Sequence, residues 1–332
     1  MSNGKKIKKE FVKNKEERPA ISFGGEALKT VKVVKGERRV QFVSPKELKE
    51  GKKISIMFDP MFKTMFANSE RIDNPAKFLS YHVDATYEEL LDSLQLINTE
   101  LDKDNVMSKG ERADFVATIR DANINVEVNN NPDIETLYRN IDFAYRLYSK
   151  NIEVGSEYKF TPTLQINLNN FKFEGIDDVE TTFYLRDEKG NILNPNLAFK
   201  NISIPNLLDK LYNEGKEVLK EGERYVLVLA ETDVEKAKEI GEGYEFMQEL
   251  INKQVEYGKK TEVFEAYDKE WAARSESYNE GHDSGFEEGK NIGVEEGQAI
   301  LIKKMLSKGK ALEEISDLLD ISIEEINSLI KE

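Results

Sequence analysis

The chain contains no cysteine and only two histidines among its 332 residues. Without cysteine it can form no disulfide bond, no thiolate-bound zinc site and no cysteine nucleophile. His82 and His282 lie far apart in the sequence, which argues against a histidine zinc site or a histidine acid–base pair. The sequence also lacks the phosphate loop Gly-x-x-x-x-Gly-Lys-Ser/Thr, the dinucleotide motif Gly-x-Gly-x-x-Gly and the Gly-x-Ser-x-Gly elbow. Carboxylates are therefore the main candidates for catalytic or metal-binding groups.

Long apolar runs are also missing. No segment approaches the ~20 apolar residues that a membrane helix needs, so we expect no membrane partner. The first nine residues are charged and no apolar stretch follows them, unlike in a secretory signal. Because the absence of cysteine also agrees with a reducing compartment, we predict a cytoplasmic protein.

Charge is distributed unevenly along the chain. Residues 1–53 hold sixteen Lys and Arg against seven Asp and Glu, a net charge of +9, whereas the whole chain carries −15. One interpretation is that this basic arm contacts phosphates while the acidic remainder holds a metal ion. The other is a solvated leader that is partly disordered. Within the arm, residues 30–34 and 39–43 could form a hairpin around residues 35–37.

The most informative segment runs from Asp114 to Asn129. Two short apolar strands, residues 114–119 and 124–129, are separated by a predicted turn at residues 121–123. Because side chains alternate across a strand, Glu127 and Asn129 point to the same side. If the hairpin folds back, Asp114 and Glu127 meet near one end of the sheet. Two carboxylates in this arrangement suit a hard divalent cation that keeps several waters.

Four segments around this hairpin carry a resemblance to a known family. They are residues 58–66 (FDPMFKTMF), residues 109–114 followed by 125–129 (KGERAD and NVEVN), residues 139–148 (RNIDFAYRLY), and Gly155 to Ile166. In this order they resemble the motifs of the PD-(D/E)XK nuclease-family transposases, also called recombination-promoting nucleases. The resemblance covers roughly residues 54–230.

The resemblance implies a metal site that hydrolyses DNA phosphodiesters. It places Mg²⁺, or Mn²⁺ as a substitute, on Asp114, Glu127 and the backbone carbonyl of Val128, where the metal would activate a water. The implied catalytic residues are Asp114, Glu127, Asn129 and Asp59. Asn129 departs from the family, which usually has Gln there, and an amide cannot act as a base.

Other residues near these motifs have two interpretations each. Asp59 precedes Pro60 and could either cap a helix or orient metal-bound water. Lys63, Lys109 and Arg139 could contact phosphate or form surface ion pairs.

Caps and periodicity predict the order helix, three strands, helix, strand. Helices begin near Asp59 and Asn74, residues 94–98 form a first strand before the hairpin, and residues 131–133 cap a helix followed by a strand at 164–168. The apolar face of that capped helix is expected to contain Ile134, Leu137, Ile141, Ala144, Tyr145 and Tyr148. We therefore predict an α/β fold with a restriction-endonuclease-like αβββαβ core and a mixed central sheet, followed by a helical C-terminal tail.

The domain organisation has four predicted parts. They are a basic arm (1–53), a nuclease-like domain (54–230), an acidic helical extension (231–280), and a tail with a glycine-repeat helix and a short helical hairpin (281–332). Glycines recur every four residues from Gly281 to Gly297. Five helical glycines would cost about 5 kcal/mol relative to alanine. The repeat therefore predicts either close helix–helix contact in a homo-oligomer or a flexible, partly helical linker.

Two functions from different classes remain open at this point. The first is a Mg²⁺-dependent DNA endonuclease associated with transposition or recombination. The alternative is a catalytically weakened relative that acts as a DNA-binding or oligomeric interaction protein. Asn129 and the acidic body favour the alternative, whereas the carboxylates Asp114 and Glu127 favour the first.

Overall fold

The computed structural model describes residues 31–67, 72–97, 113–150 and 160–330, and it has an α/β architecture around a six-stranded mixed sheet. The strand order is β2-β3-β4-β5-β8-β7. Strands β2, β3 and β4 pair antiparallel, β4-β5 and β5-β8 pair parallel, and β7 returns antiparallel to β8. The strands are β2 (Leu94–Leu96), β3 (Phe115–Ile119), β4 (Ala122–Asn129), β5 (Thr163–Asn169), β7 (Glu180–Arg186) and β8 (Ile192–Ser203).

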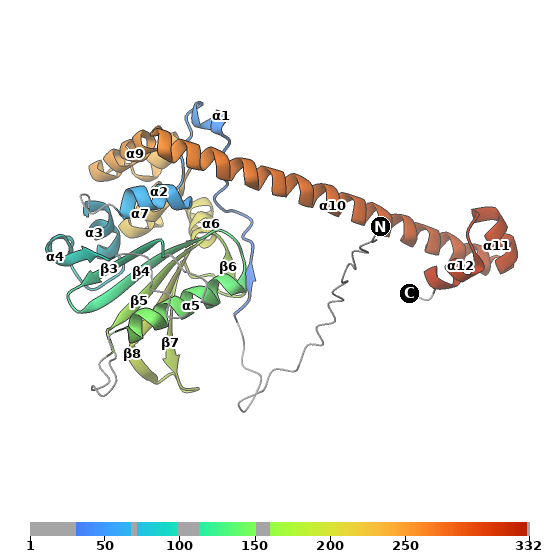
Figure 1. Cartoon of the computed structure of the whole chain (residues 1–332), viewed down its shortest axis with the longest axis horizontal. Helices are drawn as coiled ribbons and strands as arrows, with labels where there is room; N and C mark the ends of the chain where they lie inside the picture. Colours follow the sequence, from blue (N-terminus) through green and yellow to red (C-terminus); the bar gives the residue numbers. More distant parts are fainter. Residues whose placement is uncertain (1–30, 68–71, 98–112, 151–159, 331–332) are drawn as a thin grey trace, which may run out of the picture.

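Helices cover both faces of this sheet (Figure 1). Helix α5 lies on one face and contacts β4, β5 and β8. The other face is covered by a group that includes α2, α3, α7 and α9. The helices are α1 (Pro45–Leu48), α2 (Asp59–Phe66), α3 (Asp73–Ser80), α4 (Tyr87–Ser93), α5 (Ile134–Ser149), α6 (Ile204–Glu214), α7 (Glu221–Ala230), α8 (Val234–Ile240), α9 (Glu245–Gly258), α10 (Thr261–Ser307), α11 (Leu312–Leu319) and α12 (Ile323–Leu329), with a 3-10 turn at Lys216–Val218. The predicted order of helix, three strands, helix and strand is confirmed.

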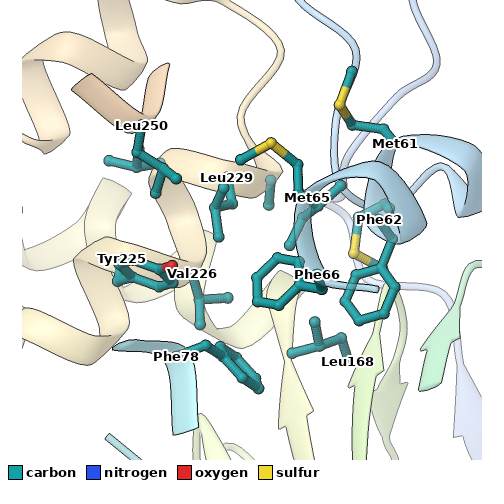
Figure 2. Close-up of a cluster of buried hydrophobic side chains, with 14 of the residues drawn as sticks. Met61, Phe62, Met65, Phe66, Phe78, Leu168, Tyr225, Val226, Leu229 and Leu250 are labelled. Atoms are coloured by element: carbon teal, nitrogen blue, oxygen red, sulfur yellow. The ribbon is translucent and has the colours of Figure 1, made fainter. Parts of the chain in front are cut away.

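The main core lies between the sheet and the helices opposite α5. Figure 2 shows Phe66 of α2 among Leu168 of β5, Phe78 of α3 and Leu229 of α7, all with 1% or less of their surface exposed. The rings of Phe62 and Phe66 stack at 4.8 Å between centroids. Losing one such buried aromatic ring costs roughly 3–5 kcal/mol. This packing fixes α2 firmly, including the face of α2 that carries Asp59 and Lys63.

The described part of the N-terminal arm follows a different path from the predicted hairpin. Strand β1 (Val33–Val34) pairs with β6 (Lys172–Phe173) and not with residues 39–43, so the hairpin prediction is wrong. Val40 and Val43 are buried in the main core. Because residues 33–43 contact segments far away in the sequence, they do not form a hairpin with each other. Gly36 itself packs against Pro205, which would lie 2.4 Å from an added Cβ.

The long helix α10 is the most extended feature of the molecule. Its first turns pack on the body, where Val263 and Tyr267 join the main core, and Figure 1 shows its remainder running outward to α11 and α12. Its 47 residues correspond to about 70 Å at ~1.5 Å per residue. At its far end Ile302, Ile315 and Ile326 form a separate fully buried cluster. No helix in the described part of the chain has both the length and the apolar character needed to cross a bilayer.

Candidate metal and nuclease site

The β3–β4 hairpin brings the two predicted carboxylates together. Phe115 pairs with Val126, so Asp114, one residue before β3, lies opposite Glu127. The backbone amide of Asp114 donates to Glu127 Oε1 at 3.3 Å. The backbone amide of Val128 in turn donates to Asp114 Oδ2 at 3.0 Å. The predicted turn is shorter than expected, because β4 begins at Ala122 and Arg120 takes a left-handed conformation with φ 54°.

Both carboxylates are held in a poorly solvated environment. Glu127 is 5% exposed, and the Asp114 side chain is 15% exposed. Burial raises the pKa of Glu127, and the neighbouring Asp114 charge raises it further. Burial also raises the pKa of Asp114, with an additional contribution from Asp59. A buried carboxylate beside a partly buried one that disfavours its charge is a donor set that a divalent cation would stabilise.

Asp59 and Lys63 of α2 complete this group. Lys63 Nζ lies 2.6 Å from Asp59 Oδ1 and 3.7 Å from Asp114 Oδ1. The helix-capping interpretation of Asp59 is wrong, because Phe58 is the N-cap residue and Asp59 makes no capping hydrogen bond. The Asp59 carboxylate instead forms an ion pair with the Lys63 ammonium, one helical turn further on. Asp59 thus lies beside the candidate metal site, where its charge affects Asp114.

Asn129 lies on the same side of β4 as Glu127 but has an environment of amides. Its Nδ2 donates to Asn169 Oδ1 at 2.8 Å, and its Oδ1 accepts from Asn140 Nδ2 at 3.2 Å. It is 2% exposed. A catalytic role of Asn129 stays a prediction. To contact water or phosphate, its side chain would have to give up or share its hydrogen bonds with Asn169 and Asn140.

A buried amide network, which the sequence did not reveal, connects this environment to Glu127. Asn125 Nδ2 donates to Glu127 Oε1 at 3.2 Å and to Gln165 Oε1 at 2.7 Å. From Gln165 the hydrogen bonds continue across β5 and β8 under α5, through the remaining members Asn129, Asn140, Asn167, Asn169 and Asn201. The signal was the run of alternating polar residues in β4 and β5, a pattern more typical of solvent-facing strands.

Of the other two cationic residues that the sequence singled out, Arg139 lies near the site and Lys109 is not described. Arg139 of α5 lies near enough to Glu127 for its charge to oppose the rise in the pKa of that carboxyl. Lys109, and the motif residues Gly155 and Tyr158, lie outside the described residues. In the part of the chain that the structure describes, no three His, Asp or Glu side chains are grouped as a metal site. A cation here would therefore depend on Asp114, Glu127, a backbone carbonyl and water, which is a donor set that Mg²⁺ accepts.

A family comparison agrees with this geometry. The model of the PD-(D/E)XK nuclease family transposase matches residues 56–282, which is more than half of the chain. The chain belongs to this family, and its six-stranded mixed sheet with flanking helices is consistent with the restriction-endonuclease-like fold. Membership indicates a nuclease or recombination function and the general use of divalent metals. No curated protein and no solved structure shows a significant match.

Proposed function

We propose that this protein is a Mg²⁺-dependent DNA endonuclease that hydrolyses phosphodiester bonds during transposition or recombination. The observation that supports it most is the pair Asp114 and Glu127, side by side at one end of the sheet and linked by the Asp114 amide, with Glu127 buried and Asp114 partly buried. Family membership supports DNA as the substrate and a divalent metal as the cofactor.

Each residue of the site has a role in this proposal. Asp114 and Glu127 would hold the cation, with the backbone carbonyl of Val128 as a third protein oxygen. A bound divalent cation would polarise the scissile phosphate and lower the pKa of the attacking water. Asp59 orients water beside Asp114, and Asn125 holds Glu127 through Oε1.

Lys63 supplies the positive charge that Asn129 cannot. Its side chain is 30% exposed, and its ammonium lies 2.6 Å from Asp59 and 3.7 Å from Asp114. When DNA binds, a phosphate oxygen can become a further partner of this ammonium, because Lys carries three donors. Arg139, whose charge also acts on Glu127, provides a second cation for the DNA backbone.

Calorimetry with Mn²⁺ tests the metal site directly. Asp114→Ala and Glu127→Ala should each lose the binding isotherm of the wild-type chain while keeping its circular dichroism spectrum. Asp121→Ala removes an exposed carboxylate from the turn of the same hairpin and is the matched control, which should bind as wild type does. Equal Mn²⁺ binding by all four proteins would contradict the proposed site and would favour the alternative of a weakened relative that only binds DNA.

The glycine repeat supports self-association through the tail as a second part of the proposal. It lies within one continuous helix, α10, and not in an irregular linker. The domain boundaries at 53, 230 and 280 also stay proposals, as does a cytoplasmic location.

A further inference from the structure

A polar cavity lies near the candidate metal site. It encloses about 430 Å³ between the segment after β1, the loop after β4 and the body-proximal part of α10. A volume in this range is typical of pockets that bind small molecules. The lining residues that matter for its chemistry are Lys35, Arg39, Phe42, Asn131, Trp271 and Arg274. We call this cavity the Trp271 cleft.

The Trp271 cleft lies near the carboxylates, because residues of its wall are close to Glu127 in the chain or contact residues next to Asp59. Its wall residue Asn130 is three residues beyond Glu127, a distance of at most about 10 Å along extended chain. The Asn130 side-chain amide donates to the carbonyl of Met57, two residues before Asp59. On the opposite wall the Phe42 ring meets Phe58 edge-on at 6.3 Å. A DNA strand bound at the carboxylates would therefore run within reach of this cleft.

The charges of the cleft favour an anion. Lys35 is exposed and Arg39 is half-buried, and within the described ranges neither forms a salt bridge. Arg274 is paired with Glu270 at 2.6 Å, so the excess positive charge belongs to Lys35 and Arg39. Among the residues that the structure describes, no carboxylate lines the cavity. In a chain with a net charge of −15, two cations without carboxylate partners are suited to phosphate groups.

The aromatic side chains favour a base. Trp271 is partly exposed to the cleft, and the Phe42 ring carries the Arg274 guanidinium at 4.2 Å on one face. Stacking of a base on an aromatic side chain contributes about 1–3 kcal/mol and tolerates any base. Asn131 and Gln41 add exposed amides that can hydrogen-bond a base edge. A base inside a duplex is already stacked on both faces, so only an unpaired base can enter such a cavity.

We propose that the Trp271 cleft binds one unpaired nucleotide of the DNA strand next to the scissile phosphate, with its base stacked on Trp271 and its phosphates near Lys35 and Arg39. The proposal rests on the nuclease function above and narrows its substrate to DNA with unpaired bases near the cut, such as strand ends or distorted junctions.

Trp271 is the chain's one tryptophan, so its fluorescence reports on this cleft without a label. The full-length chain is titrated in EDTA with a thymidine hexanucleotide, with the same hexanucleotide containing abasic sites, and with a fully paired duplex of equal length. The single strand should quench the fluorescence saturably, and its affinity should exceed that of the abasic strand by roughly tenfold or more, as expected from one stacked base. The duplex should quench weakly.

Anisotropy of a labelled hexanucleotide then separates the contributions. Trp271→Leu should weaken binding about tenfold. Arg39→Gln should weaken it less and reduce its salt dependence by about one unit of slope. Lys49→Gln, an exposed lysine of the same segment outside the cleft, is the control and should bind as wild type does. Equal affinity for intact and abasic strands, or no effect of both Trp271→Leu and Arg39→Gln, would overturn the proposal. Since no metal is present, either result leaves the test of Asp114 and Glu127 independent.

Discussion

At the scale of single residues, the two carboxylates of the candidate metal site lower the free energy of unfolding when no cation is bound. Glu127 is buried and Asp114 is partly buried, and the Asp114 charge raises the pKa of Glu127 beyond the effect of burial. Raising a carboxyl pKa by one corresponds to about 1.4 kcal/mol of unfavourable interaction with the charged form. Buried functional carboxylates commonly carry this cost, which a bound metal ion would offset.

Glu127→Gln should therefore stabilise the metal-free protein. Gln keeps the Oε1 acceptor used by Asn125 and by the Asp114 amide but removes the charge. We expect the free energy of unfolding in EDTA at alkaline pH to rise by at least about 1 kcal/mol, measured by urea denaturation. Adding Mn²⁺ should stabilise the wild type and not the variant. A variant that is less stable in EDTA and gains equally from Mn²⁺ would contradict this account.

Lys53 provides a second residue-scale prediction, far from the site. It is 2% exposed and donates to Gln254 Oε1 at 2.8 Å, and burial lowers its pKa from 10.5 to about 7. Above the lowered pKa the folded protein keeps Lys53 neutral, whereas the unfolded chain still binds the proton. The free energy of unfolding should therefore rise with pH between about pH 7 and the ordinary lysine value.

Lys53→Met removes this titration, so its stability should change less with pH than that of the wild type. The comparison is made by urea denaturation at several pH values between about 7 and 9.5, with the exposed Lys49→Met as control. Parallel pH profiles for wild type and Lys53→Met would show that Lys53 is charged in the folded state.

At the scale of elements, α5 and the three strands beneath it form a polar layer. Asn140 of α5 donates to Asn129 Oδ1 at 3.2 Å and to Asn167 Oδ1 at 2.9 Å. Such a network is favourable only while each buried amide has its partners.

Asn140→Leu should break the layer by leaving two buried carbonyl oxygens with one donor fewer. We expect a loss of about 1–3 kcal/mol in the free energy of unfolding for each group left unsatisfied, measured by urea denaturation. Tyr138→Leu, on the exposed side of the same helix, is the control. A loss no larger than that of the control would mean that the amide network contributes little to stability.

The same element shows what the sequence could and could not predict. The cap at Asp133 is observed, since its side chain accepts from the Glu135 amide, because capping is a local interaction. The predicted apolar face was partly wrong: Ile141 and Tyr145 are 37% and 47% exposed, whereas Asn140 is buried. Apolar periodicity could not reveal a helix that packs on amides.

At the candidate site, too, the sequence predicted only the contacts between residues close together in the chain. Alternation along β4 and the short hairpin sufficed to predict that Asp114 and Glu127 meet, since these contacts are local in sequence. The pairing of β1 with β6, the contact of Lys63 with Asp114 and the Trp271 cleft depend on segments between about 50 and 230 residues apart, and a single sequence carries no signal for such contacts.

At the scale of the whole molecule, α10 separates a compact body from a distant hairpin (Figure 1). In the single chain an added Cβ at Gly297 would meet nothing within 4 Å. The glycine at this position is therefore not required by packing within one chain. Contact with a second copy would give the repeat a physical reason.

Replacing the five glycines from Gly281 to Gly297 by alanine distinguishes the two interpretations of the repeat. If glycine allows helices of two copies to approach, the added methyl groups should reduce the mass in light scattering from oligomer to monomer, although alanine raises intrinsic helix stability by about 1 kcal/mol per site. Truncation after Asn279 should have the same effect on mass while the body stays folded. A full-length wild-type chain that is monomeric at micromolar concentration would refute self-association.

The central claim is that the Asp114 and Glu127 pair makes this protein a metal-dependent nuclease. The most direct measurement is the nicking of supercoiled plasmid by purified full-length protein with Mg²⁺ or Mn²⁺, compared with EDTA. We expect nicked and linear products from the wild type and from Asp121→Asn with either metal, none in EDTA, and a loss of at least about 10²-fold in rate for Glu127→Gln. Nicking by Glu127→Gln at the wild-type rate, or no nicking by the wild type with either metal, would contradict the account.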